Sequence, residues 1–127
     1  MFEPEVREVL QELLVRSEAG EVKWLDSASA GMSNTTAEDY LVLLPNTSIN
    51  IFRVSSGTVR LNFIDSAGDV SLGLDSTDED GDLLKKIFTS ASRIVTAEKT
   101  SKTLDDVRKA LSQKGPVGEI ERRNFPF

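Results

Sequence analysis

The residues most suggestive of chemistry are the acids between Asp75 and Asp82, which surround Gly81. Carboxylates that alternate with small residues around a glycine are typical of calcium-binding loops, where oxygen ligands occupy fixed positions. With Gly81 in the glycine position, however, Ser76 stands where the first aspartate belongs and Ile87 where the bidentate glutamate belongs. The segment instead favours a helix N-terminus, where acids meet free N–H groups and the positive end of the helix dipole. We expect no metal site here.

Histidine and cysteine are both absent from the 127 residues. The usual near-neutral acids, bases, nucleophiles and soft-metal ligands are therefore missing together. The sequence also contains no nucleophile elbow, phosphate-binding loop or dinucleotide fingerprint. We interpret the chain as non-enzymatic and expect no cofactor. A net charge of −6, with the 15 basic residues scattered, argues against nucleic acid as a partner.

Composition also bears on location and domain number. No stretch approaches the ~18 consecutive apolar residues of a membrane span, and the N-terminal residues lack the basic start and apolar run of a secretory signal. The lack of cysteine fits a reducing compartment. We expect a cytoplasmic chain with no membrane partner, folded as one domain over residues 1–127, since this length is common for single domains. Residues from about 115 to 127 are expected to form a C-terminal tail.

The strongest candidate for a site is one half-apolar face of the expected sheet. Because side chains alternate along a strand, this face carries both apolar and polar residues, which are Leu41, Leu43, Phe52, Val54, Arg60, Asn62 and Ile64. A fully solvated face would be more polar, whereas a fully buried one would lack Arg60. A mixed surface of this kind is typical of a protein interface. Alternatively, the C-terminal tail with Phe125 and Phe127, or the first strand, covers it from within the chain.

Two functions are consistent with this face. In the first, the chain is a small interaction or accessory module that binds a protein partner or a second copy of itself, for example as a homodimer. In the second, it binds a small anionic molecule or is an unusual enzyme, with a pocket between the polar loop 26–37 and the sheet. Arg60 would then anchor the anion beside Asn50 and Asn62. A flat apolar patch would favour the first function, and a pocket lined by these three residues would favour the second.

The elements that position these residues can be predicted from spacing and turn signals. Apolar residues at three- and four-residue spacing predict a helix from Pro4 to Ala19, ended by Gly20. Alternation predicts a short strand at 22–24 and four strands at 40–44, 49–54, 58–64 and 70–74. A capping box at Ser76 and Glu79 predicts a helix over 77–97, and a second cap at Thr103 predicts a shorter third helix. We expect an α+β fold: an N-terminal helix, an antiparallel meander of four to five strands and two C-terminal helices packed on one sheet face.

Turn residues set the expected register of the meander. Ser55-Ser56-Gly57 is predicted to be a three-residue hairpin loop with Gly57 in the left-handed region. The loop 65–68 is predicted to have four residues, which pairs Phe63 with Val70, Leu61 with Leu72 and Val59 with Leu74. The expected core face of the sheet then contains Tyr40, Val42, Leu44, Ile49, Ile51, Val59, Leu61, Phe63, Val70, Leu72 and Leu74. Trp24 is expected to lie in the core.

Overall fold

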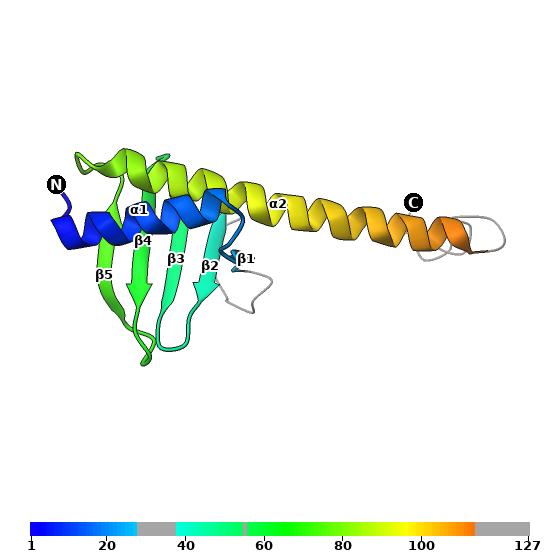
Figure 1. Ribbon diagram of the computed structural model, residues 1–127, viewed down its shortest axis with the longest axis horizontal. Helices are drawn as coiled ribbons and strands as arrows, with labels where there is room; N and C mark the ends of the chain where they lie inside the picture. Colours follow the sequence, from blue (N-terminus) through cyan, green and yellow to red (C-terminus); the bar gives the residue numbers. More distant parts are fainter. Residues whose placement is uncertain (28–37, 55, 114–127) are drawn as a thin grey trace. The chain divides into compact units, whose positions relative to one another are not determined.

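A computed structural model describes residues 1–27, 38–54 and 56–113 of the chain (Figure 1). Its elements are α1 (Pro4–Glu18), β1 (Leu25–Asp26), β2 (Asp39–Leu43), β3 (Ser48–Arg53), β4 (Val59–Ile64), β5 (Val70–Asp75) and α2 (Gly81–Ser112). The α+β class, the N-terminal helix and the antiparallel sheet are confirmed. Most of the polar loop 26–37 and the tail 115–127, with Phe125 and Phe127, lie outside the described residues. The chain divides into two compact units, Met1–Val95 and Thr96–Phe127.

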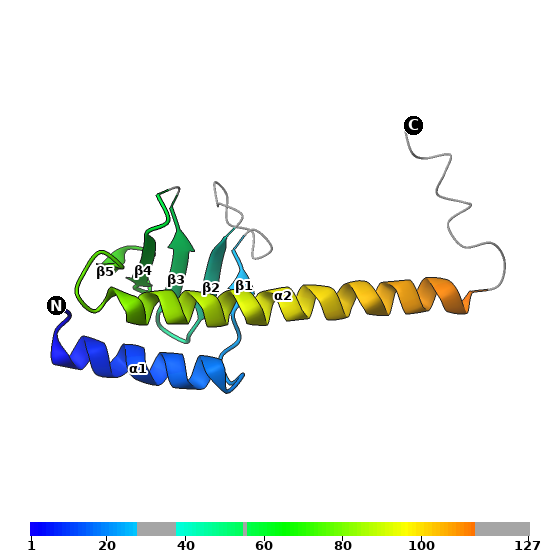
Figure 2. The same cartoon turned by 90° about the horizontal axis from the view of Figure 1, so that it is seen from above.

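The first unit contains α1, the whole sheet and the first part of α2. The five strands follow one another in the order β1-β2-β3-β4-β5, and every neighbouring pair is antiparallel. Within this unit, α1 and the first part of α2 lie on the same side of the sheet (Figures 1 and 2). The fold therefore has a covered face, towards the helices, and a second face on which no described helix packs.

The core lies between the helices and the covered face. It is held by α1 through Leu10, by the sheet through Ile51 and Leu61, and by α2 through Leu84 and Ile87, all of which are fully buried. Aromatic contacts join the sheet to α2, since the rings of Tyr40 and Phe88 lie 5.6 Å apart and the Tyr40 hydroxyl contacts Ser92 Oγ at 3.2 Å. Burial of these side chains, at ~1.5–3 kcal/mol each, provides most of the stabilisation.

Trp24 lies in the core as predicted, with its side chain fully buried. Its indole Nε1 donates a hydrogen bond to Ser17 Oγ at 3.0 Å, which satisfies the one polar atom of the ring. The short first strand is displaced from its predicted position at 22–24. It comprises Leu25 and Asp26, which pair with Leu41 and Tyr40. The chain turns at 22–24, where the Trp24 amide donates to Val22 O at 3.1 Å, so these residues do not extend as a strand.

The hairpin loop at 55–57 is consistent with the prediction. The Val54 amide donates to Thr58 O at 2.9 Å, and the amide of Gly57 donates to Val54 O at 2.8 Å. Gly57 has φ +90°, in the left-handed region that favours glycine. The resulting register pairs Ile51 with Leu61.

The predicted register between β4 and β5 is wrong. The structure pairs Leu61 with Leu74, Phe63 with Leu72 and Ile64 with Val70, with a bulge between Phe63 and Ile64. The turn closes through the Asp65 amide, which donates to Asp69 O at 2.9 Å, so the loop has three residues instead of four. The bulge then adds one residue, and the Ser71 hydroxyl donates to Phe63 O beside it. As a result Val70 faces away from the core.

Two further residues of the predicted core are accessible. Leu44 lies beyond the end of β2 and is exposed, because the chain turns there towards β3. Leu72 faces α1 but remains 37% exposed, because β5 is the last strand of the sheet and no neighbouring strand covers it.

The two predicted C-terminal helices are not observed, because α2 is continuous from Gly81 to Ser112. Ser76 does not cap a helix; its Oγ accepts a hydrogen bond from the Val59 amide at 2.9 Å. The helix begins at Gly81, where a Cβ would lie 1.9 Å from Ser76 O, so only glycine fits. Thr103 is an interior helical residue, because no glycine or proline interrupts the segment between it and Val95.

Candidate functional site

The second face of the sheet contains the predicted site residues. In-register partners and alternation define it as Asp39, Leu41, Leu43, Ser48, Asn50, Phe52, Arg60, Asn62, Ile64, Val70, Gly73 and Asp75. Six of the seven predicted residues belong to these strands. The seventh, Val54, directly follows β3 and is half-buried.

The predicted residues differ strongly in accessibility. Leu43 is 63% exposed, and Arg60 is also exposed. Phe52, Asn62 and Ile64 are half-buried. Leu41, in contrast, is only 5% exposed and is not part of the accessible surface. Near β1, the accessible apolar part of the second face is therefore smaller than the sequence predicted.

Val70 is a residue of this face that sequence reasoning missed. It pairs with Ile64 and is 57% exposed. Together with Leu43 and Ser48 these residues form one cross-strand row, Leu43–Ser48–Ile64–Val70, which we call the apolar row. Three of its four members are aliphatic. Strict alternation along β5, counted back from the buried Leu74, would place Val70 in the core. The bulge moves Val70 to the second face.

A second cross-strand row contains Phe52, Arg60 and Asp75. The Arg60 guanidinium Nε lies 3.9 Å from Asp75 Oδ2, so its charge is already partly balanced. The pKa of Asp75 is lowered, first because its carboxylate accepts the amide N–H of Thr77 and also because Arg60 is near. Arg60 is therefore paired within the sheet and is a weaker anchor for an anion than the sequence suggested.

Asn50, in the row between these two, belongs to a buried polar cluster. Asn50 Nδ2 donates to Asp39 Oδ1 and, at 3.1 Å, to Tyr40 O. Ser27 Oγ donates to the same carboxylate oxygen at 2.6 Å. Ser27, Asp39 and Asn50 are all buried. Because buried polar groups need partners, this cluster is a structural requirement, and Asn50 is not free to bind a ligand.

The acids around Gly81 join the N-terminus to the loop before α2. Asp80 Oδ2 accepts the Phe2 amide at 2.9 Å and lies 3.1 Å from Arg7 Nη2. Asp78 accepts the Asp80 amide and pairs with the Met1 amine at 2.9 Å. The backbone N–H of Asp80, followed by the Met1 amine, lowers the pKa of Asp78. Among the described residues no group of three or more acids forms a metal site.

Two surface cavities lie on the other side of the sheet, between α1 and β5. The larger, about 670 Å³, is lined by residues from the chain start, β5 and the following loop, and the smaller, about 270 Å³, by residues of α1, β4 and β5. Neither includes Asn50, Arg60 or Asn62. The anion pocket predicted between these residues and the loop 26–37 lies largely outside the described residues.

Comparisons of the chain with protein-family models, with curated proteins and with solved structures gave no match. Among the described helices, none combines the length and the apolar character needed to cross a membrane. The site must therefore be interpreted from its own geometry.

Proposed function

We propose that this chain is a non-enzymatic interaction module that binds a protein partner through the second face of its sheet. The apolar row supports the proposal most directly, because its two ends, Leu43 and Val70, expose most of their side chains and Val70 lies beside the half-buried Ile64. Exposed aliphatic side chains along one row of a sheet are typical of an interface. The cytoplasmic location expected from the composition belongs to the same proposal.

Polar groups around the apolar row give this surface the composition of an interface. Asn62 and the Arg60–Asp75 pair lie in the two rows beyond it. Interfaces commonly have an apolar centre and a rim of hydrogen-bonding and charged groups. Arg60 and the half-buried Phe52 are residue types that often contribute strongly to binding.

Self-association is supported by a separate observation on α2. In the segment Thr96–Ser112, Leu104, Val107 and Leu111 are exposed and follow one another at spacings of three and four. This spacing places them on one side of the helix, as in the seam of a coiled coil. A second copy of the chain can cover such a stripe, which supports an oligomer.

The proposal can be tested by replacing the two exposed members of the apolar row. The double variant Leu43→Ser and Val70→Ser should keep the stability of the parent to within ~0.5 kcal/mol, since both side chains are exposed. In gel filtration of an extract of its own cells, the parent should elute within a larger complex and the double variant should not.

Val15→Ser is the matched control, because Val15 is 64% exposed on α1, away from the second face. It should elute as the parent does. If all three chains elute alike, whether in a complex or alone, the second face is not the contact surface.

A further inference from the structure

The outer edge of β5 is open to pairing. Within the described residues, β5 is the last strand of the sheet and pairs only with β4. The Ser76 amide donates to Val59 O, and hydrogen-bonding directions alternate along an antiparallel strand. It follows that the backbone groups of Gly73 and Asp75 are directed outward, away from β4. They form a short template for another strand.

This edge lacks the features that usually prevent pairing. Val70–Asp75 contains no lysine and no proline, and its bulge lies at the start of the strand. Gly73 has no side chain to shield the outward backbone, and a glycine within a strand often marks a place where another backbone approaches closely. The edge is therefore accessible in its central and C-terminal part.

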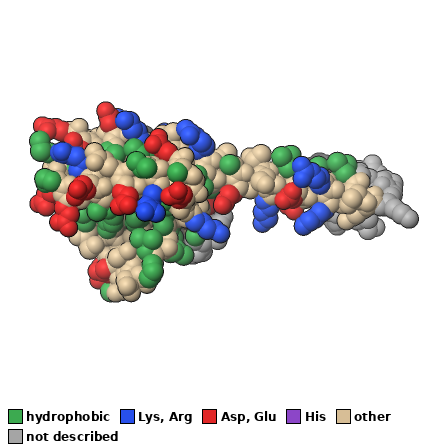
Figure 3. All heavy atoms as spheres, viewed as in Figure 1, with side chains coloured by type: hydrophobic (Ala, Val, Ile, Leu, Met, Phe, Trp, Pro, Cys, Tyr) green, Lys and Arg blue, Asp and Glu red, His purple; other side chains and the backbone are tan. Residues whose placement is uncertain are grey.

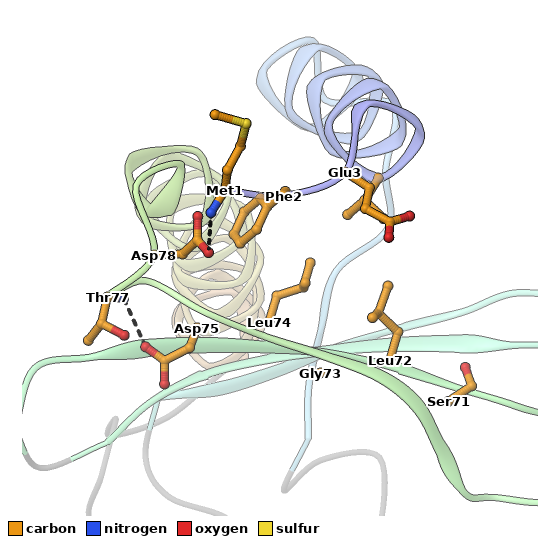
Figure 4. Close-up of a pocket in the computed structure, with 11 residues that line it drawn as sticks. Met1, Phe2, Glu3, Ser71, Leu72, Gly73, Leu74, Asp75, Thr77 and Asp78 are labelled. Carbon is orange, nitrogen blue, oxygen red and sulfur yellow. Dashed lines mark hydrogen bonds and ion pairs between the residues drawn. The ribbon is translucent and has the colours of Figure 1, made fainter.

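A groove with apolar and polar walls runs beside the open edge. Leu72 and Leu74 point from β5 towards the start of α1, where Phe2 and Glu3, the two residues before the helix, face them (Figure 4). Val6, Ser71 and Leu72 line both cavities described above, so the two cavities adjoin along β5. A strand added to β5 would direct every second side chain into this groove.

The rim of the groove is acidic. Glu3 lines the larger cavity and Glu5 the smaller one, and both are exposed. Acidic side chains gather around this end of the first unit (Figure 3). Within the described residues, neither glutamate has an ion-pair partner, whereas Asp75 and Asp78 are paired with Arg60 and the Met1 amine. A second copy docked on the same edge would bring like charges together, so a basic partner fits better.

We propose that the edge of β5 binds an extended segment of a partner protein that carries apolar residues and a lysine or arginine at every second position, so that both kinds of side chain face α1. The segment adds a sixth strand to the sheet through the backbone of Gly73 and Asp75. Its apolar side chains enter the groove beside Leu72, and its basic residues lie near Glu3 and Glu5. This site is separate from the second face and does not depend on it.

The probe is a library of short synthetic peptides, about six residues each, that matches the length of a strand. Selection on the full chain should enrich peptides that carry Val, Leu or Ile and Lys or Arg two residues apart, on one side of the strand. Peptides with Asp or Glu in place of the basic residue should not be enriched. The absence of any enrichment, or enrichment without this two-residue spacing, would overturn the proposal.

Charge reversal on the rim tests the electrostatic part. Glu3→Lys combined with Glu5→Lys should weaken binding of an enriched peptide about tenfold, because two favourable charge pairs become repulsive. The matched control is Glu18→Lys, at the other end of α1, where the acid is also exposed. It should leave the affinity unchanged. Equal affinities for all three chains would contradict the proposal.

Two further readouts identify strand addition itself. A version of the enriched peptide with N-methyl groups on alternate residues loses the donors of one edge and should bind at least about tenfold more weakly for one of the two methylation patterns. Peptide binding should also slow amide hydrogen exchange at Gly73 and Asp75. If neither methylation pattern weakens binding and the amide exchange at Gly73 and Asp75 is not slowed, the peptide binds elsewhere. The Leu43→Ser and Val70→Ser variant should still bind the peptide, which separates this result from the proposed function.

Discussion

Asn50 illustrates at the scale of one residue why much of the second face is fixed. Its amide donates to the Asp39 carboxylate and to Tyr40 O, and all of these groups are buried within the sheet. Removal of the amide would leave Asp39 with Ser27 as its one remaining side-chain donor among the described residues. A buried acceptor that loses its hydrogen-bond partner destabilises the fold, because burial has also removed the water that could donate to it.

We therefore expect Asn50→Ala to lower the free energy of unfolding by about 1–3 kcal/mol. Asn62→Ala is the control, because Asn62 is the cross-strand partner of Asn50 but is only half-buried. It should cost clearly less. Urea unfolding of the two variants and the parent measures the difference, and equal losses would show that the buried cluster has no special role.

The carboxylates before α2 predict a loss of stability in acid. The pKa values of Asp75 and Asp78 are both lowered, chiefly by backbone N–H donors. A group with a lowered pKa in the folded state stabilises the fold above its unfolded pKa, about 4, and loses this effect as pH falls through the lower folded value. Stability should therefore fall below about pH 4.

Asp78→Asn should make this fall less steep, because one of the two carboxylates no longer titrates. Urea unfolding between about pH 2 and 5 gives the slope of stability against pH for parent and variant. If both slopes agree, Asp78 is not among the groups whose protonation weakens the fold.

Sequence reasoning at this scale succeeded where a residue carries a local signal. Gly57 precedes a strand in a Ser-Ser-Gly turn, and Trp24 is a large apolar residue, so their conformation and burial could be anticipated. The cluster of Ser27, Asp39 and Asn50 could not, because its members are 11 or 12 positions apart and meet only after the strands pair.

At the scale of elements, β5 determines which leucines form the core. Leu74 is buried and pairs with Leu61, whereas Leu72 is partly exposed at the sheet edge. Ile87 of α2 is fully buried. Truncation of a buried aliphatic side chain leaves a cavity, whereas an edge site can be filled by solvent.

Ile87→Ala should therefore cost about 2–5 kcal/mol, and Leu72→Ala clearly less. Thermal or urea unfolding of the two variants measures the difference. A loss for Leu72→Ala as large as that for Ile87→Ala would mean that the edge of β5 is covered, which would contradict both the register and the open groove.

Sequence reasoning missed the register of β5 and the continuity of α2. A bulge beside Ser71 leaves no pattern in the sequence, yet it moves Val70, the first residue of β5, to the other face. The Thr103 to Asp106 pattern resembles a helix cap. Such a pattern starts a new helix only where the preceding helix has ended, and no glycine or proline between Gly81 and Thr103 ends α2. In contrast, α1 and the strands β2 to β5 could be predicted from periodicity and turn signals.

At the scale of the whole molecule, the stripe of Leu104, Val107 and Leu111 predicts self-association. Leu104→Lys combined with Leu111→Lys should reduce the mass measured by light scattering from an oligomer to a single chain of 14.0 kDa. Charges in an apolar seam oppose pairing, whereas these exposed positions tolerate lysine in the monomer. The control Arg108→Lys keeps the charge and should keep the oligomer. An unchanged mass in the double variant would exclude this stripe as the contact.

The second face itself could be predicted only in outline. Alternation identified its residues, but the burial of Leu41 and the exposure of Val70 depend on the neighbours that the fold supplies. The sequence likewise suggested Arg60 as an anion anchor, and only the three-dimensional register shows that Asp75 lies opposite it.

The most direct test of the central claim is photo-crosslinking from the apolar row in the cells that produce the chain. A photoreactive phenylalanine analogue in place of Leu43 should form a defined covalent adduct with a partner protein or with a second copy, since this side chain is 63% exposed on the second face. The same analogue in place of Val15, on α1, should form no such adduct. A defined adduct from position 43 alone is the result the account predicts. No adduct from either position, or the same adducts from both, would contradict it.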